Sequence, residues 1–147
     1  MPQVLIVFDS HTGNTEKMAR AIAEGAQNTS EVTVEVKRHR SPWGLDSFDA
    51  IVVGAPTYQH TMTNSIEKFL EDVAFHNVNL KGKIGAAFGS YGWSGEAPGM
   101  VLEVMVNKFE MKVLKPPLLI KYKPDEKGLA ECRNLGKTVA EQIQKRY

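Results

Sequence analysis

The sequence predicts an α/β fold, a doubly wound three-layer sandwich on a five-stranded parallel sheet with strand order 2-1-3-4-5. Apolar runs typical of strands alternate along the chain with segments whose apolar residues recur at helical spacing, which predicts a parallel sheet with helices on both faces. Two strands are apolar throughout, as expected of the centre of such a sheet. The last strand contains two prolines, which cannot donate ladder hydrogen bonds and therefore favour an edge.

Five segments are predicted to form the strands. The first and third are the apolar ones, and the second alternates apolar and polar residues, so it suits the opposite edge. The segments are residues 4–8, 32–36, 50–55, 84–89 and 113–120, the last interrupted by Pro116 and Pro117.

Four helices are predicted between and after these strands. The first follows residues 10–15 and the others cover residues 65–75, 96–109 and most of 124–147. Residues 41–48 contain a proline and a glycine and are too broken for a long helix. The residues expected to face the core are Met18, Ala19, Ile22, Ala23 and Ala26 in the first helix, Ile66, Phe69, Leu70 and Val73 in the second, and Leu129, Cys132, Gly136, Val139 and Ile143 in the last.

Length and composition narrow the class of protein. A chain of 147 residues predicts one domain spanning residues 1–147. The net charge of +1 does not favour nucleic acid or an anionic membrane as a partner, and the single cysteine excludes an internal disulfide. With no signal peptide and no run of about 20 apolar residues, we expect a cytoplasmic protein without a membrane span, a monomer or a weak homo-oligomer.

Three loops should meet at the carboxyl ends of the strands, where ligands bind in such sheets. They are residues 10–15, 56–61 and 90–95. The first is a polar turn between a buried strand and a helix. Its backbone N–H groups and side chains form a donor-rich cradle that suits a phosphate group. The turn consists of Ser10, His11, Thr12, Gly13, Asn14 and Thr15.

An ordinary helix cap by Thr12 or Asn14 is the alternative interpretation of this turn. The turn contains no lysine or arginine, so it would hold a monophosphate by hydrogen bonds and leave its charge in place. It also lacks the G-x-x-x-x-G-K-[ST] pattern of nucleoside triphosphatases and the G-x-G-x-x-G pattern of dinucleotide-binding folds.

Residues 10–16 (SHTGNTE) resemble the phosphate motif [ST]-x-T-G-N-T of flavodoxins. Residues 55–58 (APTY) and 86–95 (AAFGSYGWSG) resemble the flavodoxin domain of flavodiiron proteins, also called A-type flavoproteins. The resemblance covers essentially the whole chain and implies a flavodoxin-like fold that binds FMN without a covalent link. Flavodiiron proteins also carry a di-iron domain, but His11, His39, His60 and His76 form no H-x-E-x-D-H pattern, so the resemblance covers the electron-carrying part alone.

The resemblance further implies that the second and third loops hold the isoalloxazine ring, with Tyr58 and Trp93 flanking it. Core packing is the alternative interpretation for the aromatic residues. For Tyr91 the sequence favours neither core packing nor ring binding. His60 is either a base beside the ring or, as we favour, a solvated loop residue, and Cys132 is expected in the core. The ring-binding residues expected are Pro56, Thr57, Tyr58, Gln59, His60, Ser90, Tyr91, Gly92, Trp93 and Gly95.

No catalytic triad, Cys–His pair or metal-ligand cluster is recognisable in these loops, so the chemistry should belong to the cofactor. We therefore expect an electron carrier that exchanges electrons with donor and acceptor proteins. An NAD(P)H- or quinone-linked FMN oxidoreductase is the alternative, and a non-redox interaction module is a third possibility.

Overall fold

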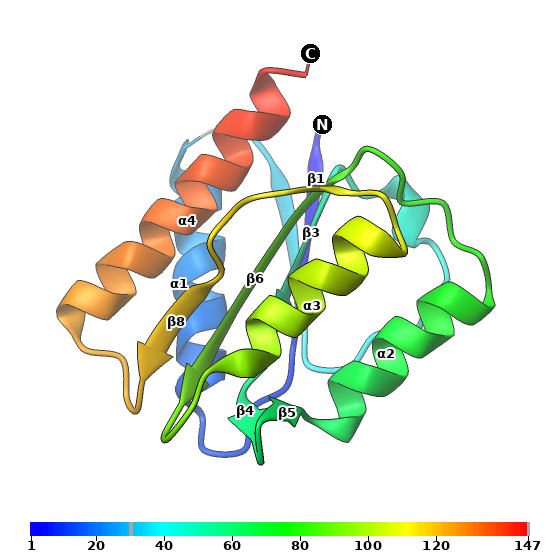
Figure 1. Ribbon diagram of the computed structural model, residues 1–147. Coiled ribbons are helices and arrows are strands. Elements are labelled where there is room, and N and C mark those ends of the chain that lie inside the picture. The colour runs from blue at the N-terminus through cyan, green and yellow to red at the C-terminus, as the bar shows by residue number, and fades with distance from the viewer. Residues whose placement is uncertain (30, 147) are drawn as a thin grey trace.

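A parallel sheet separates two layers of helices in the computed structural model, which describes residues 1–29 and 31–146 (Figure 1). The sheet runs in the order β2-β1-β3-β6, and both β7 and β8 pair with β6 at its far side. This order confirms the predicted order 2-1-3-4-5, and every pair in the sheet is parallel, as predicted. The strands are β1 (Gln3–Phe8), β2 (Thr33–Lys37), β3 (Ala50–Gly54), β6 (Ile84–Tyr91), β7 (Lys112–Val113) and β8 (Leu118–Lys121).

The last strand of the sheet is divided into two pieces, whereas the sequence predicts one interrupted strand. β7 pairs with the start of β6, where Ile84 lies opposite Lys112, and β8 pairs with its end, where Phe88 lies opposite Leu118. The prolines at 116 and 117 lie between the two pieces. Because proline has no N–H to donate to β6, the ladder stops there and resumes after the second proline.

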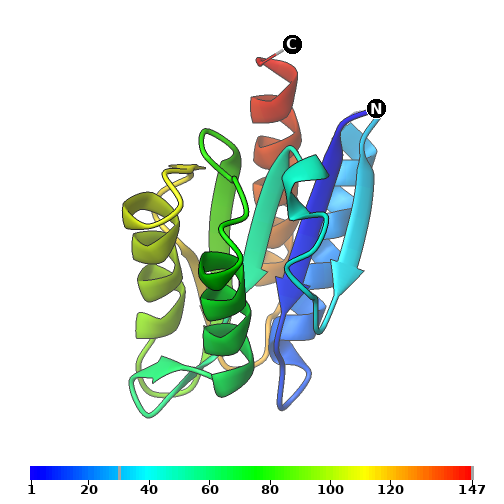
Figure 2. The ribbon, with the colours of Figure 1, turned by 90° about the vertical axis from the view of Figure 1, so that its right-hand side faces the viewer.

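Two helices cover each face of the sheet (Figures 1 and 2). α1 (Asn14–Thr29) and α4 (Glu126–Gln144) lie on one face, and α2 (Asn64–Phe75) and α3 (Glu96–Asn107) on the other. Residues 41–48 contain only the short 3₁₀ helix η1 (Leu45–Ser47), as expected. The predicted end of the last helix reaches Tyr147, which lies outside the described residues.

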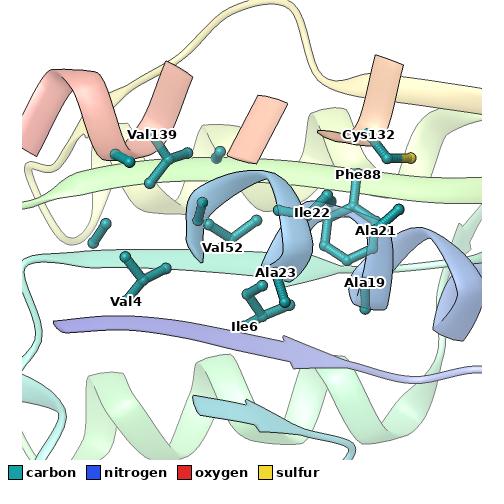
Figure 3. Close-up of a cluster of buried hydrophobic side chains, with 14 of the residues drawn as sticks. Val4, Ile6, Ala19, Ala21, Ile22, Ala23, Val52, Phe88, Cys132 and Val139 are labelled. Atoms are coloured by element: carbon teal, nitrogen blue, oxygen red, sulfur yellow. The ribbon is translucent and has the colours of Figure 1, made fainter. Parts of the chain in front are cut away.

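Each helix layer buries its own apolar cluster against the sheet. Figure 3 shows the cluster beneath α1 and α4, where Val52 and Phe88 of the sheet pack against Ile22 of α1 and Val139 of α4. The predicted core faces are confirmed: the residues named for α1 and α2 are buried, as are Cys132, Gly136, Val139 and Ile143 of α4. Leu129 is partly buried and packs against the same cluster.

Two glycines allow α1 and α4 to pack backbone against backbone. A Cβ atom on Gly136 of α4 would lie 2.0 Å from the carbonyl oxygen of Ile22, and one on Gly25 of α1 would lie 1.9 Å from that of Arg133. Real Cβ atoms do not approach other atoms this closely. The separation of the two helices therefore depends on both positions remaining glycine.

A small hairpin follows β3 that the sequence analysis does not predict. β4 (Thr57–Tyr58) pairs antiparallel with β5 (Thr61–Met62), and Gln59 and His60 form the two-residue tip. Both tip residues have positive φ, 50° and 67°. Two-residue hairpin turns with positive φ at both positions match the twist of the strands, although Asn-Gly is the usual sequence for them.

The carboxyl ends of the parallel strands share one edge of the sheet, from which the hairpin projects (Figure 1). The start of β1 and the end of α4 lie together at the opposite edge (Figure 1). Among the described residues, no helix combines the length and apolarity needed to cross a membrane.

Candidate functional site

A cavity of about 170 Å³ opens at the carboxyl edge of the sheet, between the first turn of α1, the β4–β5 hairpin and the end of β6. The three predicted loops therefore do meet at one place. The cavity is lined by His11, Thr12, Asn14, Thr15, Pro56, Thr57, Tyr58, Ser90, Tyr91, Gly92 and Tyr122.

Most of the residues predicted to bind the cofactor are among these lining residues, and the others lie behind or outside the cavity wall. The predicted residues that do not line the cavity are Ser10, Gly13, Gln59, His60, Trp93 and Gly95. Whether any of them contacts a bound cofactor stays a prediction.

Ser10 caps the turn that leads into α1. Its hydroxyl accepts the backbone N–H of Gly13 at 3.1 Å and that of Glu16 at 3.3 Å. The side chains of Thr12 and Asn14 have no hydrogen-bond partner among the described residues, although both line the cavity. Capping, the alternative interpretation of this turn, is therefore performed by Ser10, which leaves the donors of Thr12 and Asn14 available to a ligand.

Two threonines fasten the loops to one another. The Thr15 hydroxyl accepts the backbone N–H of Ser90 at 3.2 Å, and the Thr57 hydroxyl accepts that of Ala97, in the first turn of α3, at 3.0 Å. Both threonines are buried. Their positions hold the cavity wall together, which is a structural contribution that the sequence alone does not reveal.

A buried carboxylate that the sequence analysis missed lies under the turn. The Asp9 side chain is 5% exposed, accepts the Ser10 backbone N–H at 2.8 Å, and lies 3.5 Å from His11 Nε2 and 3.7 Å from Arg38 Nη2. Burial acts to raise the pKa of Asp9, but the nearby Thr63 hydroxyl, the hydrogen bond from the Ser10 backbone N–H and the charges of Arg38 and of His11 in its protonated form lower it overall. Asp9 is thus an anion, and the available sequence signal was an acid directly after a buried strand.

Arg38 brings a cation to a turn that contains none of its own. It follows the end of β2, and its guanidinium also donates to the backbone carbonyl of Ser10. Arg38 pairs with Asp9 and does not line the cavity, so the expectation that a bound phosphate keeps its charge stays a prediction. Because Arg38 comes from a distant segment, only the sheet pairing of β1 with β2 brings it there.

Tyr58 is the tyrosine that forms the hairpin side of the cavity. Its ring stacks on the His11 ring, with 4.8 Å between centroids and 18° between planes. Burial, together with the negative charge of Asp9, raises the pKa of the Tyr58 hydroxyl, which therefore stays neutral at physiological pH. The stack gives His11 a packing role beside the cavity.

Trp93 lies outside the cavity in this structure, 87% exposed, with its ring 5.5 Å from that of His60. His60 Nδ1 is 2.7 Å from Glu96 Oε2 and 3.2 Å from the Ser94 hydroxyl, so this exposed histidine joins the hairpin tip to the loop before α3. Hydrogen bonds from Ser94 and His60 lower the pKa of Glu96.

Tyr122, between β8 and α4, also lines the cavity and was not predicted. An aromatic residue directly after the fifth strand was the signal that could have indicated it. Cys132 is fully buried in the core, as predicted, and burial raises the pKa of its thiol to about 12. The described part of the chain holds no group of His, Cys, Asp and Glu side chains that could bind a metal ion.

A donor-rich turn at a helix start and a tyrosine-lined cavity lie together at the carboxyl ends of the strands, where open α/β sheets of this class bind their ligands. The family model described as Flavodoxin matches residues 6–136, so the chain belongs to the flavodoxin family. Members of this family typically bind FMN and carry electrons.

Similar proteins include both single-domain and longer ones. A solved structure of an archaeal flavodoxin shares 40% identity, with a TM-score of 0.89, covering 97% of this chain and 99% of that one. The type A flavoprotein fprA of Rhodobacter capsulatus is 33% identical over 95% of this chain, and the anaerobic nitric oxide reductase flavorubredoxin of Vibrio vulnificus is 33% identical over 94%. This chain spans only 33% and 28% of the length of those two relatives.

The structure of the Synechocystis Flv1 flavodiiron core is also similar, with 25% identity and a TM-score of 0.86 over 99% of this chain and 37% of that one. The family resemblance seen in the sequence is thus confirmed by two kinds of protein. One is a flavodoxin of similar length, and the other is the matching part of flavodiiron proteins.

Proposed function

We propose that this protein binds one FMN without a covalent link and carries electrons between redox partner proteins. The observation that carries the proposal is the turn at the start of α1. Ser10 satisfies the cap, while Thr12 and Asn14, which have no side-chain partner in the described part of the chain, present donors to the cavity at the positive end of the helix dipole. This donor set fits a phosphate monoester.

The rest of the cavity suits a flat aromatic ring. Tyr58 and Tyr91 line it from two different loops, and Gly92 leaves backbone exposed between them. Gly89 precedes Tyr91 in β6 and lies close to the backbone of Ala55. A Cβ atom on Gly89 would be 2.1 Å from the Ala55 carbonyl oxygen. The hairpin and the end of β6 are therefore held together, and the ring would lie against both.

FMN supplies the redox chemistry in such a protein, because it accepts and releases electrons singly or in pairs. The protein's residues bind, orient and shield it. Thr12, Asn14 and backbone N–H groups of the turn would hold the phosphate, and Tyr58 and Tyr91 would limit the access of water to the ring.

The first test is cofactor content. We expect the purified protein to be yellow, to release FMN on denaturation, and to rebind one FMN per chain in a fluorescence titration. A protein that takes up no flavin at saturating FMN would overturn the proposal and favour the non-redox interaction module.

The second test separates an electron carrier from an oxidoreductase. The sequence contains no second nucleotide-binding motif, so we expect reduction of the bound FMN by NADPH or NADH to be slow when no partner protein is present. Stopped-flow absorbance measures this directly. Fast reduction that saturates with NADPH would assign the protein to the NAD(P)H-linked oxidoreductases instead.

A further inference from the structure

Tyr122 is an exposed aromatic residue in a strained backbone conformation. It has a φ of 60°, a region that residues with side chains rarely adopt, and 61% of its surface is exposed. It therefore contributes little to the core. Strain of this kind costs about 1–3 kcal/mol and persists where surrounding contacts hold it, often at ligand clamps.

The contacts that hold Tyr122 come from the cavity itself. Its backbone N–H donates to the Tyr91 carbonyl at 2.7 Å, and its own carbonyl accepts the Ser90 hydroxyl at 2.9 Å. Both partners line the cavity, as Tyr122 does. The turn after β8 is thus fixed to the end of β6 on both sides of the strained residue.

The ring of Tyr122 lies beside the backbone of the third loop. A Cβ atom on Gly92 would make an ordinary van der Waals contact with it, 3.5 Å from its Cε1 atom, so the ring lies next to this glycine. On the other side, the Lys121 ammonium lies 5.4 Å from the ring centroid. The ring therefore lies at the cavity between Gly92 and Lys121 and is largely exposed rather than buried in the core.

We propose that Tyr122 is an additional wall of the cofactor cavity, which contacts bound FMN and limits its exposure to water. This inference rests on the proposed function, and it adds the turn after β8 to the three loops that the sequence indicates. The backbone strain is the consequence of placing an aromatic ring at this point rather than a feature needed for folding.

The substitution Tyr122→Gly separates the two roles, because glycine adopts positive φ without strain and has no ring. We expect the FMN dissociation constant to rise about three- to tenfold, as for the loss of one aromatic contact. The melting temperature of the FMN-free protein should stay the same or rise. A variant that binds FMN as tightly as the wild type overturns the inference.

Glu110→Gly is the matched control. Glu110 has a similar φ of 54°, is exposed, and lies between α3 and β7, away from the residues that line the cavity. This variant should relieve strain in the same way and leave the FMN dissociation constant unchanged. Equal weakening of FMN binding in both variants would attribute the effect to backbone relaxation and contradict a contact by Tyr122.

A measurement on the wild type is independent of any folding defect in the variants. Tyrosine nitration by tetranitromethane, mapped by mass spectrometry, should be slower at Tyr122 when FMN is bound than in the FMN-free protein. Equal nitration in both states overturns the inference. If the wild type binds no FMN, the proposed function fails and this inference with it, whereas wild-type binding with an unaffected Tyr122 overturns the inference alone.

Discussion

The Thr15 hydroxyl accepts the backbone N–H of Ser90 at 3.2 Å, across 75 residues of sequence. The bond joins the first turn of α1 to the end of β6, the two elements between which the cavity opens. Thr12, three residues earlier in the same turn, has no such partner among the described residues. Two threonines of one motif therefore differ: the hydroxyl of Thr15 joins two elements of the fold, and that of Thr12 faces the cavity.

Replacing Thr12 by valine should weaken FMN binding at least tenfold, because a hydrogen bond to a charged group contributes about 1.5–3 kcal/mol. The melting temperature of the FMN-free protein should not change. Fluorescence titration and thermal unfolding measure the two quantities. Thr15→Val is the comparison: it leaves the buried Ser90 N–H without an acceptor and should lower the free energy of unfolding by about 1–3 kcal/mol. An unchanged dissociation constant in Thr12→Val would refute the assignment of its hydroxyl to the phosphate.

Asp9 should make the protein sensitive to acid. Its pKa in the folded state lies below the ordinary value of 3.8, so the unfolded chain binds the proton more readily. The stability it contributes is therefore complete above pH 4 or so and is lost as the pH falls through the folded pKa.

Asp9→Asn should accordingly lower stability at neutral pH and flatten the decline in unfolding free energy below pH 4, measured by urea unfolding at a series of pH values. Asp46→Asn is the control, since Asp46 is exposed and forms no ion pair within the described chain. Parallel pH curves for the wild type and Asp9→Asn would contradict this role.

Gly136→Ala should destabilise the fold, although replacing glycine by alanine inside a helix normally stabilises it by about 1 kcal/mol. The new methyl would lie 2.0 Å from the Ile22 carbonyl oxygen, so α4 must move away from α1. We expect a loss of about 2 kcal/mol or more in unfolding free energy, in the range of overpacked cores. Gly99→Ala provides the control in α3, where a Cβ atom meets nothing within 4 Å; similar effects in both variants would argue against the close helix contact.

The second one-electron reduction potential of bound FMN should lie below that of free FMN. The second electron adds negative charge to the ring, in a cavity that Tyr58 and Tyr91 line and where charge is screened less well than in water. Removing the ring in Tyr58→Ala should move the potential toward that of free FMN, by about 60 mV for each tenfold change in equilibrium. A spectroscopic redox titration measures this, and an unmoved potential would refute the shielding argument.

Trp93→Ala tests the other aromatic residue in the same titration. Trp93 is 87% exposed and outside the cavity, so its removal should shift the potential less than that of Tyr58. A shift as large as the one in Tyr58→Ala would show that Trp93 covers the ring when FMN is bound, as the sequence analysis predicts.

The sequence predicted the sheet order because each part of it depends on local patterns. Apolar runs identify β1 and β3, and the pair of prolines at residues 116 and 117 indicates that the last strand lies at an edge of the sheet. The hairpin was not predicted because Gln59 and His60 lack the glycine or asparagine that usually signals positive φ.

Site residues that come from distant segments were the hardest to predict. Arg38 reaches Ser10 only because β2 pairs with β1, and Tyr122 reaches the cavity only because β8 pairs with β6. The residues next to Arg38 or Tyr122 in the sequence do not indicate which strand each neighbouring strand pairs with. The polar turn and the two aromatic loops, by contrast, follow the ends of strands that were themselves predictable, so their meeting place was predictable too.

The start of β1 and the end of α4 both lie at the end of the sheet opposite the carboxyl ends of its strands, where the cavity opens (Figure 1). A purification tag, a surface linker or a fused domain attached at either of these points therefore leaves the mouth of the cavity facing outward. Immobilised on an electrode through one of these ends, the protein would present its cofactor site to the solution, and soluble partners could be assayed against a fixed, oriented layer. Direct electron transfer between a bound flavin and the electrode would instead require attachment near the hairpin.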